Sequence, residues 1–250
     1  MAITLDGTNG VTTPDLTVDT TTLTVDPSNN RVGIGTASPS YTLHSSTSTG
    51  ADYAGFFHNG AGSGNGTALV AKGGANNSGA GTFIVQDYSG NEDFKVDGLG
   101  KVTTPNQPYF EACFSTTAWT DYAKGGTWTK MDMDATLTNV GGHYNTTNKH
   151  FVAPVDGKYF FSASVFLNVT WNSSTPYLSY LGFYKNNAFF AHFGQDVQST
   201  EHIRHGIIMP LAANDYVDVR IQQAQSPTTN QYYKQANGRN YTYFHGMLIG

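Results

Sequence analysis

Carboxylates are the first residues to consider for chemistry, and few of them occur in useful positions. Glutamate occurs only as Glu92, Glu111 and Glu201. Asp132 and Asp134 alternate along one expected strand face, but no second carboxylate is predicted across a cleft from them, as glycosidic cleavage requires. We therefore expect these acids to be solvated strand residues, and we predict that the protein is not an enzyme.

Histidine and cysteine are the other candidates for chemistry. Among the eight histidines, His202 and His205 are three residues apart, so in a strand they point to opposite faces and cannot hold one ion together. One histidine repeated around the axis of a trimer could bind a metal. The single cysteine, Cys113, has no base predicted beside it and is expected to be a small buried hydrophobe. We expect no cofactor and assign no metal ligand.

Recognition chemistry is better represented than catalysis. Four segments, at residues 118–126, 170–176, 195–201 and 226–240, together contain aromatic rings, amides and a few charges. Aromatic rings supply stacking area at low entropic cost and amides supply hydrogen bonds, which suits contact with carbohydrate or protein. Alternatively, some of these rings pack between subunits. The candidate contact residues are Trp119, Tyr122, Trp171, Asn172, Gln195, Gln198, Tyr232, Tyr233, Lys234, Asn237 and Arg239.

The overall composition argues against several classes of protein. Only 12% of the 250 residues are charged, the formal net charge is −5, and Lys and Arg form no cluster, so we expect no nucleic-acid binding. No window approaches the roughly 18 apolar residues of a membrane span, so we expect no membrane insertion. The start, Met-Ala-Ile-Thr-Leu-Asp-Gly, lacks the features of a secretory signal. We expect synthesis in a cytoplasm and exit by lysis or on a particle.

Aromatic residues divide the chain into two parts. Residues 1–104 hold 7 of the 33 aromatics, and residues 105–250 hold the other 26. A segment poor in aromatics and rich in Gly, Thr, Ser and Asn buries little apolar area by itself. We place the boundary at Thr104 and Pro105. The predicted domains are an N-terminal attachment segment (1–14), a repetitive β shaft (15–104) and a globular head (105–250).

The expected shaft contains short strands closed by Gly, Asn or Asp. The segments 31–36, 83–87, 94–97 and 101–103 are three to six residues long and carry regularly spaced apolar side chains. Such strands are marginal alone, so we predict that three copies wind around one axis and cover each other's apolar side chains and strand edges. The alternative is a disordered Gly/Ser linker. Residues 50–82 could be continuous shaft or a small side domain.

Two stretches of the shaft carry a resemblance. One runs Asn-Arg-Val-Gly-Ile-Gly-Thr from residue 30 and continues to His44, and the other runs from Gly90 through Phe-Lys-Val-Asp-Gly to Thr103. Both resemble motifs that recur in bacteriophage tail-fibre shafts. The first motif also occurs in bacterial surface proteins, so it indicates a fibrous β shaft more firmly than a phage origin.

The head shows strand periodicity with apolar residues on both faces. In residues 158–167, Tyr159, Phe161, Ala163, Val165 and Leu167 form one apolar face, while the other face still includes Phe160 and Phe166. The last strand is apolar on both faces to its end. A face directed to solvent would not need these side chains, so we predict that another subunit covers it. The predicted trimer interface comprises Phe160, Phe166, Tyr243, His245, Met247 and Ile249.

The head also carries a resemblance, over about 140 residues. Tyr144-Asn145, Phe151 through Pro154, and Gly157-Lys-Tyr-Phe-Phe161 resemble landmarks of the complement globular-head and tumour-necrosis-factor jelly-roll family. Residues 182–186, 211–219 and 243–249 continue the match, with Asn214 where the family usually has glycine. The resemblance implies a ten-stranded jelly-roll β-sandwich, assembled as a tight homotrimer, with the four candidate recognition segments as loops at the end far from the chain termini.

The leading interpretation is a virion fibre protein that binds a host receptor. The predicted partners are two further copies of the chain, other virion proteins through the N-terminal segment, and a host surface glycan or protein through the head loops. Residence on the virion, at tail or capsid surface, is expected. A capsid fibre or decoration protein with a structural role is the alternative. A secreted bacterial adhesin is a third reading, which the missing signal disfavours.

Overall fold

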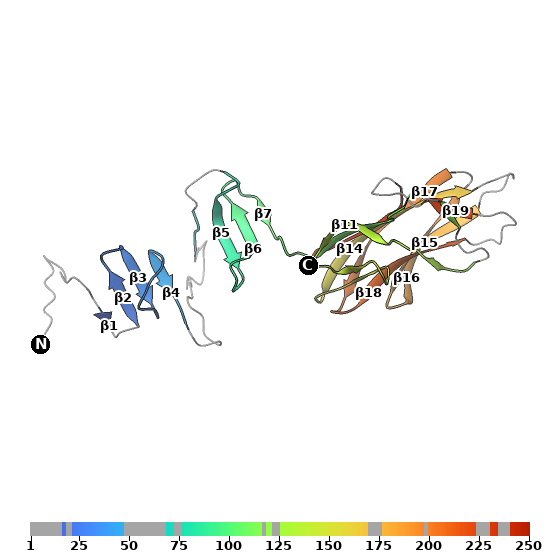
Figure 1. The fold of residues 1–250 in the computed structure, drawn as a ribbon. Helices are drawn as coiled ribbons and strands as arrows, with labels where there is room; N and C mark the ends of the chain where they lie inside the picture. Colours follow the sequence, from blue (N-terminus) through green and yellow to red (C-terminus); the bar gives the residue numbers. More distant parts are fainter. Residues whose placement is uncertain are drawn as a thin grey trace, which may run out of the picture. The chain divides into compact units, whose positions relative to one another are not determined.

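The structure, a computed structural model, is built from β-strands. It describes residues 17–18, 22–47, 69–72, 77–116, 119–121, 126–169, 177–197, 200–223, 231–234 and 241–250. No helix occurs in these ranges, which confirms the all-β prediction and leaves no helix there that could span a membrane. Contacts divide the chain into two units, Met1–Lys72 and Gly73–Gly250 (Figure 1). The domain boundaries at residues 14 and 104 stay predictions.

The first unit contains a small four-stranded sheet. Strands β1 (Thr17–Val18), β2 (Leu23–Asp26), β3 (Arg31–Ile34) and β4 (Leu43–Ser45) lie in that order, and β3 pairs with β4 in parallel. The β2–β3 turn is closed by the Asp26 carboxylate, which accepts hydrogen bonds from Asn29, and by Asn30 at φ 52°. Asparagine tolerates this left-handed conformation.

The second unit begins with a three-stranded antiparallel meander. Strands β5 (Gly81–Gln86), β6 (Glu92–Asp97) and β7 (Val102–Thr103) are joined by two turns of the same design. Each turn is held by an aspartate side chain, Asp87 or Asp97, that accepts backbone N–H groups from the residues two and four positions later. The apolar side chains of Phe83, Ile84 and Val85 stay exposed on the single chain.

The head is a sandwich of two antiparallel sheets (Figure 1). The seven-stranded sheet has the order β11 (Ala135–Val140), β8 (Tyr109–Cys113), β20 (Tyr243–Leu248), β14 (Gly157–Val169), β19 (Gln231–Lys234), β9 (Trp119–Asp121), and β17 (Thr200–Leu211) also pairs with β14. The six-stranded sheet has the order β12 (Tyr144–Asn145), β13 (His150–Val152), β18 (Tyr216–Gln223), β15 (Tyr177–Lys185), β16 (Ala188–Val197), and β10 (Thr129–Lys130) pairs with β18.

The strand count differs from the ten that the resemblance implied. The two sheets hold thirteen strands among the described residues of the head. Four of them, β9, β10, β12 and β13, have only two or three residues. The sandwich is therefore of the expected kind, with short additional pairings.

The core lies between the two sheets and is aromatic. Alternate residues of β14, from Tyr159 to Leu167, are completely buried, as the sequence predicted. From β8, the ring of Phe110 stacks on Phe151 at 5.0 Å and on Tyr144 at 5.1 Å between centroids. The Tyr144 hydroxyl donates to the Met133 carbonyl at 3.0 Å. Cys113 is buried, as expected. This packing fixes which side chains of each sheet face outward.

Candidate functional site

The predicted recognition residues lie only partly in the described chain. Tyr122, Trp171, Asn172, Gln198, Asn237 and Arg239 fall outside the described residues. Trp119 belongs to β9, and Tyr232, Tyr233 and Lys234 belong to β19. These two strands pair, with Lys234 opposite Trp119 and Tyr233 opposite Thr120, so the backbones of the first and fourth segments run side by side.

One predicted recognition residue has a described side-chain partner. Gln195 lies on β16, and its Nε2 donates to the Glu201 carboxylate on β17 at 3.0 Å. β16 belongs to the six-stranded sheet and β17 to the seven-stranded one. The bond therefore links the two sheets near the third segment, and Gln195 has a structural role there.

The predicted trimer-interface residues gather on the outer face of the seven-stranded sheet. Phe160 on β14 lies in register between Ile208 on β17 and Met247 on β20. The exposed fractions of these three side chains are 36%, 57% and 39%. We call them the apolar stripe. Ile249, just beyond β20, is also exposed. A single chain therefore leaves a row of large apolar side chains uncovered across three neighbouring strands.

The same face continues as a row of aromatic rings. Phe166 lies opposite His202 in the β14–β17 register, with ring centroids 4.4 Å apart, and contacts Tyr241 at 4.9 Å. Tyr243 stacks on His245 at 4.2 Å. Burial, and then the nearby Arg204, lower the pKa of His202, so its imidazole is neutral at neutral pH. The interface residues expected from the sequence thus share one sheet face.

Sequence reasoning missed three members of this face. Ile208, His202 and Tyr241 lie beside the predicted residues only because of how β17 and β20 pair with β14. A usable signal was the alternation along β17, where Ile203 and Met209 are buried and the even-numbered residues point outward. His202 was considered from the sequence only as a metal ligand.

The face also holds a buried acid. Glu111 on β8 is only 4% exposed and lies in register with His245. The Tyr109 hydroxyl donates a hydrogen bond to its carboxylate. No group of three His, Cys, Asp or Glu side chains that could hold a metal occurs within the ranges that the structure describes.

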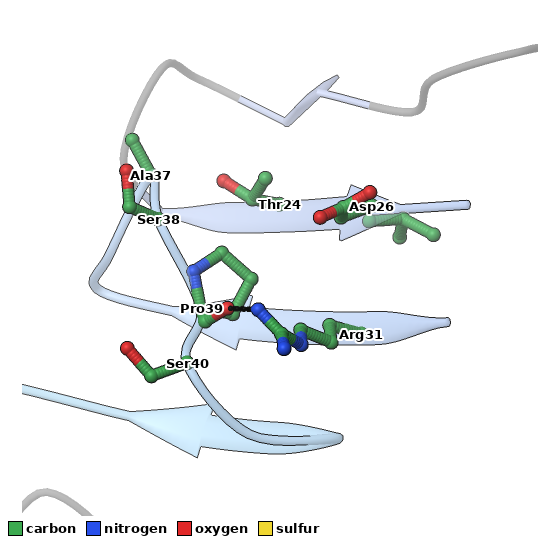
Figure 2. Close-up of a pocket in the computed structure, with 8 residues that line it drawn as sticks. Thr24, Asp26, Arg31, Ala37, Ser38, Pro39 and Ser40 are labelled. Atoms are coloured by element: carbon green, nitrogen blue, oxygen red, sulfur yellow. Dashed lines mark hydrogen bonds between the residues drawn. The ribbon is translucent and has the colours of Figure 1, made fainter. Parts of the chain in front are cut away.

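A separate pocket of about 480 Å³ opens in the four-stranded sheet of the first unit. Figure 2 shows the Arg31 side chain pointing from β3 toward the loop before β4, where its Nη1 donates to the Pro39 carbonyl at 2.9 Å. Asp26 across the pocket has its pKa lowered chiefly by the Asn29 side-chain hydrogen bond. Both charged groups of the pocket therefore hydrogen-bond to neighbouring loop residues of the same sheet.

Comparison with protein families gives a match over the head. The family model described as the C1q domain matches residues 113–249. A curated relative, Complement C1q tumor necrosis factor-related protein 6 of Rattus norvegicus, is 30% identical over 88 residues, which cover 35% of this chain and 32% of that protein. The chain thus spans about a third of the length of this curated relative.

Two solved structures match this chain at low sequence identity. The globular domain of zebrafish complement 1qA protein has 15% identity and a TM-score of 0.39, covering 58% of this chain and 98% of that one. The structure of Eiger TNF from S. frugiperda has 10% identity and a TM-score of 0.42, covering 58% of this chain and 94% of that one.

Proposed function

The chain belongs to the C1q domain family, and on that premise we propose that it is a homotrimeric fibre protein of a bacteriophage virion, whose head attaches the particle to a host cell. Domains of this family commonly trimerise and mediate binding. The observation that carries the proposal is the apolar stripe of Phe160, Ile208 and Met247, together with the aromatic rings beside it.

The stripe favours trimerisation through burial. Large apolar side chains in register on three neighbouring strands form one continuous patch, and such patches mark protein contacts. In a trimer each copy presents this face to its neighbours, which removes the patch from water. His202 on the same face has its pKa lowered by burial, so its imidazole adds no charge that would have to be desolvated at neutral pH.

The same reasoning supports a trimeric shaft. Phe83, Ile84 and Val85 in β5, and Leu43 in β4, remain exposed although they lie in ordered strands. Three chains wound around one axis would cover these side chains and the open strand edges. Residues 1–14 would then join the shaft to other virion proteins, and the fibre would reside on the tail or the capsid surface.

Attachment would work by multivalency and without enzymatic turnover. The paired strands β9 and β19 bring the Trp119 and Tyr232–Lys234 segments together at the backbone, where aromatic and amide side chains suit a host surface glycan or protein. Three heads in each fibre, and several fibres in each particle, would convert weak contacts into firm adhesion.

Three experiments test the proposal. Sedimentation equilibrium of the full chain should give a trimer, and a stable monomer would refute the assembly. Imaging of particles with a labelled head should place the label at the tail, whereas label on the capsid would favour the capsid fibre. Replacing Trp171, Tyr232 and Tyr233 together by alanine should abolish adsorption while the trimer persists; unchanged adsorption would refute binding through the loops.

A further inference from the structure

The outer face of the six-stranded sheet carries a second group of aromatic side chains, on the other sheet from the apolar stripe. Trp128, just before β10, has its ring centroid 5.6 Å from Tyr184, 6.3 Å from Tyr180, 6.2 Å from Phe189 and 6.1 Å from His192. We call these five residues the outer aromatic cluster. Its members come from β15, β16 and the segment before β10, so the folded sheet creates it.

A glycine makes room for the central ring. A Cβ atom at Gly182, on β15 between Tyr180 and Tyr184, would lie 2.6 Å from Cζ3 and 2.8 Å from Cη2 of Trp128. The indole therefore rests directly on the strand backbone, flanked by the two tyrosines. Trp128 is only partly buried and lines an open groove.

Beside the cluster lies an oriented guanidinium. Asp218 on β18 is 1% exposed and accepts hydrogen bonds from Arg220 Nε at 2.6 Å and Nη2 at 3.1 Å. Arg220 Nη2 also donates to Asn187 Oδ1 at 2.5 Å, and the guanidinium stacks over the Tyr184 ring at 3.9 Å. Arginine has five N–H donors, so Nη1 keeps its two hydrogens without a partner among the described residues.

The groove between these groups has a local positive charge. It encloses about 510 Å³ and is lined by Trp128, Lys130, Asn148, His150, Asn187, Tyr216, Asp218 and Arg220. Lys130 and Arg220 outnumber the single acid Asp218, so the lining carries one net positive charge in a chain of net −5. Lys130 Nζ lies 3.3 Å from Asp218 and donates to the Asn148 carbonyl at 2.7 Å, which leaves it a third hydrogen.

His150 does not add to this charge. It stacks on Tyr216 at 4.6 Å between ring centroids. Burial first, and then the positive charge of Lys130, lower its pKa, so it is neutral at neutral pH. The groove therefore has one unit of charge to neutralise and suits a monoanion better than a polyphosphate.

We propose that this groove binds an acidic saccharide, a sugar bearing a carboxylate. The apolar face of the sugar packs on Trp128 at the edge of the cluster, as aromatic rings commonly provide flat apolar area with a polar rim. The carboxylate accepts hydrogen bonds from Arg220 Nη1 and Lys130 Nζ, which are charge-assisted and therefore strong. The side-chain amides of Asn148 and Asn187 provide hydrogen bonds to hydroxyls.

The groove shares no residue with the predicted receptor contacts or with the apolar stripe. The cluster lies on the six-stranded sheet, while the apolar stripe lies on the opposite outer face of the sandwich. A trimer built through the stripe leaves three copies of the groove open to solvent, and a monomer leaves one. Failure of the trimer would thus appear in sedimentation, and failure of this site would appear only in saccharide binding.

The test is a binding assay of the full chain against an array of purified saccharides, with uronic acids, sialic acid, phosphorylated sugars and neutral sugars. We expect binding to carboxylated members that weakens as salt is added. Trp128→Ala and Lys130→Gln should each weaken it about tenfold or more. The matched controls Tyr88→Ala and Lys101→Gln remove an exposed ring and an exposed lysine outside the head sheets, and they should bind like the wild type.

Gly182→Ala provides a variant that retains every groove side chain. Its methyl group displaces the Trp128 ring from the strand, so carboxylated sugars should again bind less tightly, with circular dichroism reporting the fold. If Trp128→Ala does not fold, Lys130→Gln still tests whether the groove binds the carboxylate. Absence of binding to every carboxylated sugar, preference for neutral or phosphorylated sugars, or full binding by Lys130→Gln overturns the proposal.

Discussion

Replacing Ile208 by aspartate is expected to dissociate the proposed trimer while the head stays folded. Ile208 lies on β17, points away from the core and retains 57% of its surface exposed in the single chain. Its register partner Phe160 and, one strand further, Met247 complete the apolar stripe. The substitution therefore changes the face that subunits would share and leaves the interior between the sheets intact.

The magnitude follows from the area that remains to be buried. Complete burial of an isoleucine side chain is worth about 1.5–3 kcal/mol. Covering the exposed 57% is then worth about 1.3 kcal/mol per subunit and about 4 kcal/mol per trimer. Since about 1.4 kcal/mol is a factor of ten, the trimer association constant should fall about 1000-fold. Three carboxylates in an apolar contact add a desolvation penalty to this loss.

Sedimentation equilibrium over a series of micromolar concentrations measures the effect, and circular dichroism confirms that the strands persist. The matched control is Phe189→Asp, which places the same charge on a side chain 51% exposed on the other sheet. The control should remain trimeric. If Ile208→Asp sediments as the wild type does, or if both variants dissociate alike, the assignment of the apolar stripe as the interface is refuted.

Three further outcomes are expected within the head. Lys185 lowers the pKa of Asp215 to about 2 through a hydrogen bond. The ionised Asp215 therefore contributes fully to the free energy of unfolding above about pH 4, the usual pKa of an aspartate, and this contribution is lost as the pH falls toward 2. In Asp215→Asn, the decrease in unfolding free energy at acid pH, measured by urea titration, should be smaller by about 1 kcal/mol, a figure that allows for solvent screening. Tyr144→Phe removes the donor to the Met133 carbonyl and should cost about 1 kcal/mol of unfolding free energy, measured in urea. Gly246→Ala adds a methyl within 2.5 Å of a core ring and should lower the midpoint of thermal unfolding through a cost of about 1–3 kcal/mol.

Strand periodicity was sufficient to predict the core of β14 and the apolar character of its outer face. A strand alternates its side chains strictly, so Tyr159 and Phe161 had to share one face and Phe160 and Phe166 the other. The structure places the first pair at 0% exposure and the second pair outward. Periodicity depends only on the residues within one strand, so it was sufficient to predict which face of β14 each of these side chains occupies.

The features that the sequence did not reveal depend on the pairing of strands that are far apart in the chain. Ile208 completes the apolar stripe only through the register of β17 with β14, across 48 positions of sequence between Phe160 and Ile208. The outer aromatic cluster likewise depends on β15 lying between β16 and β18. Gly182 was read from the sequence as a family landmark, and its physical reason, the space that Trp128 occupies, appears only in the folded sheet.

Net charge illustrates why composition constrains partners only on average. The value of −5 argues against a protein covered in basic residues, but it describes the whole surface. Within the groove, the buried Asp218 accepts hydrogen bonds from Arg220 and lies 3.3 Å from Lys130 Nζ, so the two cations together exceed the one acid beside them. A buried carboxylate that fixes two cations is less costly than an isolated one, and it holds the remaining donors of both cations in position for a ligand. The sandwich can therefore combine an apolar face for its own copies with a weakly cationic face for an acidic sugar, although neither face is visible in the composition.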